Sequence, residues 1–205
     1  MILNIFSPFY YKGKVKDHDK MRETLVPHIE SNYNKNPNNQ PPSWSCKVHT
    51  SYLNTDQNLE DIKTAYNENI IEFLQEIHFP YCRIDIKSAW YNVYKKGQWQ
   101  EIHNHYGGTD GTYFSAVHFL KYDAKTHTSL VFNNTNSTLL QPFKLGRDSS
   151  VDYWNIKHQV EVAEGDIIIF PSTLDHFVLP QESDELRITV SFNIIAISEN
   201  SFSHI

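Results

Sequence analysis

The hydrophobic pattern changes its period at Pro80, and this change constrains the fold more than any other feature. Beyond it, apolar and polar residues form short β-type runs, several of them alternating, which are separated by Gly, Asp, Asn and Pro. Such runs predict strands. The expected strands are residues 82–94, 114–123, 128–134, 158–171 and 186–197. Several short strands with turns between them, and no helices among them, favour a β-sandwich or jelly roll.

The residues before Pro80 predict a first strand and two helices. The second helix is the better defined, because Asp56 can cap it and Pro80 ends it. Pro27 would disturb the interior of the first helix. We expect the strand over residues 2–11, the first helix over residues 17–33 with Met21, Leu25 and Ile29 at helical spacing, and the second with an apolar stripe of Leu59, Ile62, Ala65, Tyr66, Ile70, Phe73, Leu74 and Ile77.

Composition excludes several classes of function. The 205 residues are 40% hydrophobic, which suits a folded domain with its own core. A formal net charge of −6 provides no basic surface for nucleic acid. The chain has no apolar run of the roughly 18 residues that a membrane span needs, and no recognisable signal peptide. With only two cysteines, a disulfide framework is not expected. We therefore expect a cytoplasmic protein, without predicting its oligomeric state.

Three histidines stand where one metal ion could bind them. On a strand, residues i and i+2 face the same side about 6–7 Å apart, so His103 and His105 can reach one ion. His176 follows a turn at residues 164–166 and an apolar strand that ends at Pro171. In a jelly roll, a neighbouring strand can bring His176 opposite the pair. Three imidazoles leave coordination positions open, as a catalytic non-haem iron requires.

Arg187 begins another inward-facing strand, and a buried arginine is costly unless it meets an anion. Its planar guanidinium matches a carboxylate with two parallel hydrogen bonds. Thr189 points to the same face and can add a hydroxyl. A metal ion beside this pair suits a ligand that chelates at one end and carries a carboxylate at the other. 2-Oxoglutarate has this shape.

Four segments carry a resemblance to a known family over roughly residues 80–195. They are WYNVYKKGQWQEIHNH, FSAVHFL, GDIIIFPSTLDH and RITVSFN. The sequence resembles the Fe(II)/2-oxoglutarate-dependent oxygenases, in particular the prolyl-hydroxylase-like oxygenases of marine bacteria and their phages. The resemblance implies a mainly β chain with N-terminal helices (α+β), built on the cupin-like double-stranded β-helix.

Within that fold, residues 1–205 are expected to form a single domain. Residues 1–79 would supply the N-terminal strand and the supporting helices. Residues 80–197 would form the double-stranded β-helix core, with the helices against its major sheet.

The resemblance also implies roles for individual residues. His103 matches the first iron ligand and His176 the distal histidine. Arg187 matches the residue that forms a salt bridge with the far carboxylate of 2-oxoglutarate, and Thr189 the hydroxyl beside it. Tyr94 resembles a tyrosine that hydrogen-bonds the same cosubstrate.

The second ligand position departs from the family pattern, because most members have His-x-Asp or His-x-Glu where this chain has His105. Three alternatives follow. His105 is itself a ligand, Asp110 supplies the carboxylate instead, or the position is vacant and His105 lies beside the metal. We favour the first, since His-x-His also occurs in cupins.

The implied cofactors are Fe(II), 2-oxoglutarate and O2, and the implied reaction hydroxylates a substrate with release of succinate and CO2. The substrate is expected to be a small molecule or a peptide or protein side chain, in the host cytoplasm if a phage encodes the protein. One alternative is a cupin dioxygenase or isomerase that does not use 2-oxoglutarate, although it would not need Arg187. Another is a non-catalytic jelly-roll module.

Overall fold

The computed structural model describes residues 8–52, 58–81, 83–106, 112–134 and 156–197. The elements in chain order are β1 (Tyr11–Lys14), α1 (His18–Lys35), β2 (His49–Thr50), α2 (Leu59–Glu76), β3 (Arg83–Tyr94), β4 (Gln100–His103), β5 (Phe114–Lys121), β6 (Leu130–Asn133), β7 (Lys157–Gln159), β8 (Asp166–Pro171), β9 (His176–Val178) and β10 (Arg187–Ile197).

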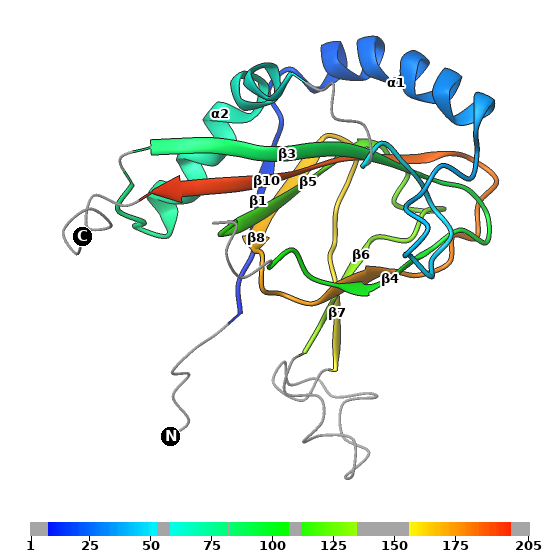
Figure 1. The fold of residues 1–205 in the computed structure, drawn as a ribbon. Coiled ribbons are helices and arrows are strands. Elements are labelled where there is room, and N and C mark those ends of the chain that lie inside the picture. The colour runs from blue at the N-terminus through cyan, green and yellow to red at the C-terminus, as the bar shows by residue number, and fades with distance from the viewer. Residues whose placement is uncertain (1–7, 53–57, 82, 107–111, 135–155, 198–205) are drawn as a thin grey trace.

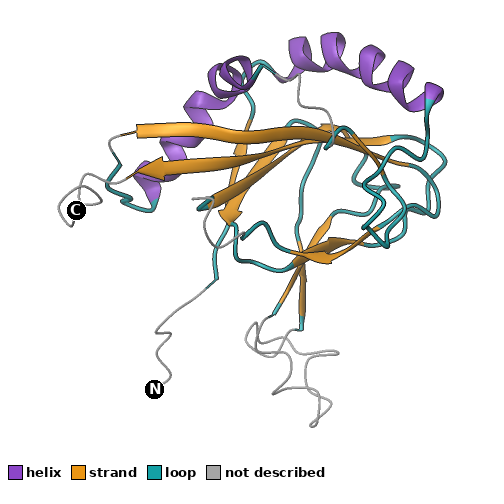
Figure 2. Ribbon diagram, in the orientation of Figure 1, coloured by secondary structure: helices purple, strands orange, loops and turns teal. Residues whose placement is uncertain are grey.

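Two antiparallel sheets form the body of the molecule (Figures 1 and 2). The larger sheet has the strand order β1-β8-β5-β10-β3-β2, and the smaller has the order β4-β9-β6-β7. In Figure 1, α1 and α2 lie over one side of the larger sheet and the smaller sheet lies on its other side. The mainly β fold with N-terminal helices is therefore confirmed, as is the packing of the helices on the major sheet.

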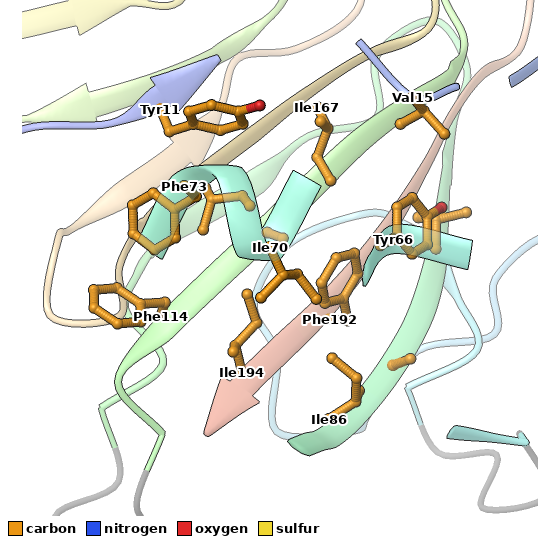
Figure 3. Close-up of a cluster of buried hydrophobic side chains, with 14 of the residues drawn as sticks. Tyr11, Val15, Tyr66, Ile70, Phe73, Ile86, Phe114, Ile167, Phe192 and Ile194 are labelled. Carbon is orange, nitrogen blue, oxygen red and sulfur yellow. The ribbon is translucent and has the colours of Figure 1, made fainter. Parts of the chain in front are cut away.

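The helices are attached to the larger sheet by a cluster of buried aromatic and aliphatic side chains (Figure 3). On α2, Tyr66 and Phe73 face the sheet, and both are fully buried. The Tyr66 ring lies 4.7 Å from that of Phe192, and the Phe73 ring 4.8 Å from that of Phe114, between centroids. Burial of such side chains contributes roughly 1.5–3 kcal/mol each.

The opposite face of the larger sheet packs toward the smaller sheet. Successive side chains of a strand alternate between the two faces, so Val117 and Phe119 of β5 join Ile168 and Phe170 of β8 on this inner side. Both faces of β8 are thus covered, which explains why Ile167–Phe170 is a continuous apolar run. The sheets enclose the space in which the site is built.

The strand predictions need three adjustments. The β-type run over residues 158–171 is divided into β7 and β8, and the turn expected at residues 164–166 is confirmed, with Gly165 at a φ of +84°. The first strand is β1, so residues 8–10 are not strand as expected, and residues 1–7 lie outside the described residues. The short strands β2, β4 and β9 have no clear alternating pattern of their own.

The helix predictions are confirmed with local corrections. Helix α1 continues through Pro27, which leaves the Glu23 carbonyl without the usual amide donor of the next turn. The N-cap of α2 is Asn58, whose side chain accepts a hydrogen bond from the Glu60 amide at 3.2 Å, and Asp56 lies outside the described residues. Ala65 faces solvent, unlike the rest of the predicted stripe. Neither described helix has the length and apolar character to cross a membrane.

Phe73 provides a test of the helix–sheet interface. Replacing this buried ring with alanine should lower the free energy of unfolding by about 3–5 kcal/mol, since it removes apolar contact and leaves a cavity. Urea denaturation followed by circular dichroism measures the loss. The control is Gln75→Ala on the exposed side of α2, which should change stability by less than about 0.5 kcal/mol. Equal effects of the two variants would contradict the packing described.

Candidate active site

His103, His105 and His176 converge at the end of the smaller sheet. His103 is the last residue of β4 and lies opposite His176, the first residue of β9. His105 lies two residues beyond the end of β4 rather than within the strand, yet its ring faces the same place. The ring centroids are 4.3 to 5.3 Å apart, and one nitrogen of each ring lies within 4.8 Å of the others. This spacing allows all three to bind one metal ion.

Each of these rings is oriented by a hydrogen bond at Nδ1. His103 Nδ1 lies 2.8 Å from the Glu101 carbonyl oxygen, and His176 Nδ1 lies 2.8 Å from that of Leu174. His105 Nδ1 lies 2.8 Å from the Asn193 side-chain oxygen. A carbonyl oxygen only accepts, so each Nδ1 carries the proton and each Nε2 keeps its lone pair for a metal ion.

Burial keeps the three imidazoles neutral. It lowers the pKa of His103, and it lowers the pKa of His105 to about 4, where the neighbouring His103 adds to the effect. Burial also lowers the pKa of His176 far below its ordinary value. Metal ions bind the neutral form of imidazole, so the cluster is prepared for binding at physiological pH.

A buried cation lies in the same pocket as the histidines. Arg187 is only 1% exposed, and its Nε and Nη1 atoms have no hydrogen-bond partner. Its guanidinium lies 4.8 Å from the centre of the Tyr94 ring and 5.5 Å from that of Phe119. Among the described residues, no carboxylate forms an ion pair with it. The unpaired donors therefore call for an anionic ligand.

The pocket joins the cation to the histidines. Thr189 and Tyr94 are buried beside Arg187, and the Tyr94 hydroxyl donates a hydrogen bond of 2.6 Å to Gln100. The pocket is lined by Trp90, Asn92, Tyr94, Gln100, His103, His105, Val117, Leu130, His176, Val178, Arg187, Thr189 and Ser191. Its donor set fits a metal ion at one end and a carboxylate at the other.

A larger cleft adjoins the histidines on their other side. Trp44, Tyr52, Trp90 and Tyr106 contribute aromatic rings to it, and Lys87 and Glu101 contribute opposite charges. The ring centroids of Trp44 and Tyr52 are 5.3 Å apart, as are those of Tyr52 and Trp90. Trp90 in turn lies 5.4 Å from the His105 ring. Aromatic side chains thus line the cleft up to the three histidines.

Two further residues that could bind a metal ion by their chemistry, His118 and Asp110, are not part of this described cluster. His118 faces the helices, where its ring is hydrogen-bonded to Tyr66 and to His18. Asp110, the alternative third ligand, lies outside the described residues. Sequence reasoning missed the parts played by Trp44 and Tyr52, whose segment carries no local signal that places it over the cleft.

The central and C-terminal part of the chain matches a known family. The sequence model of the family described as "Putative 2OG-Fe(II) oxygenase" matches residues 88–193. The chain belongs to this family. The oxygenase accordingly uses Fe(II), 2-oxoglutarate and O2. The match includes all three clustered histidines and Arg187, whereas Trp44 and Tyr52 lie before it.

Solved structures share the fold of the oxygenase. A Pseudomonas putida prolyl-4-hydroxylase has a TM-score of 0.60 and 13% identity, over 92% of this chain and 93% of that chain. A viral collagen prolyl hydroxylase of Paramecium bursaria Chlorella virus-1, solved as its 2OG complex, has a TM-score of 0.57 and 15% identity, over 91% of this chain and 95% of that chain. The non-heme alpha ketoglutarate dependent carbocyclase SnoK from nogalamycin biosynthesis has a TM-score of 0.62 and 11% identity, over 93% of this chain and 80% of that chain.

These likenesses establish the double-stranded β-helix fold for the oxygenase. No curated protein matches the chain in sequence.

The lowered histidine pKa values predict how pH affects the metal-free oxygenase. Its folded state resists protonation of His105 down to about pH 4, whereas an unfolded histidine accepts a proton near pH 6.5. The unfolded state therefore binds more protons in this window, so stability should fall as pH drops from about 6.5 to about 4.

Urea denaturation at several pH values measures this dependence. The loss is at most about 1.4 kcal/mol per pH unit for one histidine. His105→Gln should have a shallower slope than the unaltered protein, because it lacks the group whose pKa is lowered. A steeper slope in His105→Gln would contradict the assignment.

Proposed function

We propose that the oxygenase binds Fe(II) through His103, His105 and His176, and binds the far carboxylate of 2-oxoglutarate through Arg187. The observation that carries this proposal is the buried guanidinium of Arg187, whose Nε and Nη1 atoms have no hydrogen-bond partner, in the pocket that the three histidines line. Among the described residues, Arg187 contacts aromatic rings but no carboxylate. A pocket with a metal-binding end and a cationic end matches the two ends of 2-oxoglutarate.

The interactions of Arg187 explain why an anion would bind there strongly. A buried polar group without a partner costs about 1–3 kcal/mol, and more when it is charged. A carboxylate would accept hydrogen bonds from the guanidinium and would be held away from water by the Tyr94 and Phe119 rings. The Thr189 hydroxyl, on the same face of β10, supplies a further donor.

His105 is favoured over Asp110 as the third ligand. Its ring lies 5.0 Å from that of His176 and 5.3 Å from that of His103, and its Nδ1 is hydrogen-bonded so that Nε2 is available. Three neutral ligands would leave the metal its full positive charge, which attracts a dianionic cosubstrate.

Hydroxylation of a substrate is the proposed reaction. When bound, Fe(II) supplies the O2-dependent chemistry that converts 2-oxoglutarate to succinate and CO2 while the substrate is oxidised. The protein's own residues hold the carboxylate at Arg187, keep the imidazoles neutral and exclude water from the buried end of the pocket.

The aromatic cleft is the proposed place of the substrate. It reaches His103 and His105, and Trp44, Tyr52 and Trp90 provide apolar surface against which a hydrocarbon group can pack. Lys87 and Glu101 contribute opposite charges, so the cleft provides no field of one sign for a polyanion. A small molecule or a peptide side chain suits these walls.

Arg187→Gln tests the cosubstrate site. Anaerobic addition of Fe(II) and 2-oxoglutarate should produce a weak visible charge-transfer band in the unaltered protein. The variant should need roughly 10 to 100 times more 2-oxoglutarate to reach half of this band, because it loses charge-assisted hydrogen bonds of about 1.5–3 kcal/mol. Its affinity for Fe(II) alone should be nearly unchanged.

The matched control is Arg83→Gln, which alters an exposed arginine paired with Asp85 and should leave the titration as it is. An unchanged affinity for 2-oxoglutarate in Arg187→Gln would remove Arg187 from its proposed role. Failure of folded, iron-loaded protein to develop the band would contradict the proposed complex itself.

Isotope labelling tests the proposed reaction type. Compounds from metabolite and peptide panels that stimulate succinate formation are incubated with the oxygenase under ¹⁸O2, and the products are weighed by mass spectrometry. Hydroxylation predicts one labelled oxygen atom in the organic product as well as one in succinate. A product that forms in step with succinate but carries no added oxygen would show a different oxidation, such as ring closure.

A further inference from the structure

The three histidines differ in what holds their Nδ1 atoms. His103 and His176 each donate to the backbone carbonyl two residues earlier in the chain. These acceptors belong to the main chain, so no side-chain replacement removes them. His105 instead donates to the side-chain oxygen of Asn193, which is 88 positions away in the sequence. The orientation of His105 thus depends on one side chain of β10.

Asn193 is itself held by serines from neighbouring strands. Its Oδ1 atom accepts a hydrogen bond of 2.9 Å from Ser115 on β5, and its Nδ2 atom donates one of 3.1 Å to Ser88 on β3. Ser115 is in turn 2.8 Å from the Ser172 hydroxyl, and both serines are fully buried. The pairing of β10 with β3 shifts register between Asn193 and Ile194. Such β-bulges are common next to functional sites.

The direction of the Asn193 amide decides which nitrogen of His105 carries the proton. With Oδ1 toward the ring, Nδ1 must donate, and Nε2 has a free lone pair. An amide turned by 180° would present its NH2 group instead, so Nδ1 would accept and the proton would sit on Nε2. An imidazole protonated there could not bind a metal ion through that atom.

We propose that Asn193 is a positioning residue that holds His105 in the Nδ1-protonated tautomer and so makes it a metal ligand. This inference rests on the proposed function, which assigns His105 to the metal. A carboxylate at position 105 would need no such partner, because it has no tautomers. The network of Ser88, Ser115 and Asn193 therefore accounts for a histidine where most of the superfamily has Asp or Glu.

The test compares two variants of the full chain. Asn193→Asp keeps an acceptor oxygen, and Asn193→Leu removes it at similar size. Proteins with ¹⁵N-labelled histidine are studied without metal at neutral pH by long-range ¹H–¹⁵N correlation, which distinguishes Nδ1–H from Nε2–H. His105 should be Nδ1-protonated in the unaltered protein and in Asn193→Asp, and should lose this preference in Asn193→Leu.

Cobalt(II) affinity gives a second readout, followed by the visible absorption of the bound ion. Loss of the partner of a ligand histidine should weaken cobalt(II) binding about 10- to 100-fold in Asn193→Leu, with rescue in Asn193→Asp. The control is Asn69→Leu. It removes a buried asparagine on α2 that donates to the Lys14 carbonyl, so it should lower stability and leave the tautomer and the cobalt(II) affinity unchanged.

The outcomes separate this inference from the proposed function. An Nε2-protonated His105 in the unaltered protein would overturn the role of Asn193 without any variant. So would an Asn193→Leu protein that keeps both the Nδ1–H tautomer and full cobalt(II) affinity. If instead the tautomer is lost while cobalt(II) affinity stays the same, His105 is not a ligand, and both the three-histidine site and the role of Asn193 in it fail.

Discussion

The arrangement of the site depends on one buried cation, Arg187, that has no carboxylate partner within the described residues. Arg187 is almost fully removed from water, and the space beside it leads to three imidazoles rather than to a carboxylate. Burial of a charge in this state is unfavourable unless a ligand completes it. This is why we propose that the pocket binds an anion that also reaches the histidines.

Strand β10 carries Arg187 and also packs against the helices. Its inward side chains include Arg187 and Thr189, which line the pocket, and Asn193, which is hydrogen-bonded to His105. Its opposite face packs against the helices through Ile188, Val190, Phe192 and Ile194. Because successive side chains of a strand point to opposite faces, the same backbone carries both the helix-packing surface and the polar groups of the site. The helices thus pack against the strand that carries Arg187, Thr189 and Asn193.

The fold was accessible from the sequence because its signals are local. Alternation in β5 and β10, the apolar stripe of α2 and the Gly165 turn all follow from residues near one another in the chain. The meeting of His103 with His176 and the inward direction of Arg187 were also expected, from strand alternation and family resemblance. That these residues bind iron and 2-oxoglutarate is still a prediction.

The remaining features depend on contacts between distant segments. Trp44 and Tyr52 line the cleft because the isolated β-bridge between Lys47 and Trp99 holds their segment there. No local sequence pattern predicts this bridge. The position of His105 beyond the end of β4, and its bond to Asn193, likewise depend on how β4 meets β10 in space. The sequence favoured His105 over Asp110 only by analogy with other cupins, because no local pattern places its ring beside His103 and His176.

A crystal structure of the anaerobic complex with Fe(II) and 2-oxoglutarate tests the central claim most directly. It should show one ion bound by the Nε2 atoms of His103, His105 and His176, with the far carboxylate of 2-oxoglutarate against the guanidinium of Arg187. A carboxylate ligand such as Asp110 in place of His105 would contradict the three-histidine site. A cosubstrate bound away from Arg187 would contradict the role of the buried cation.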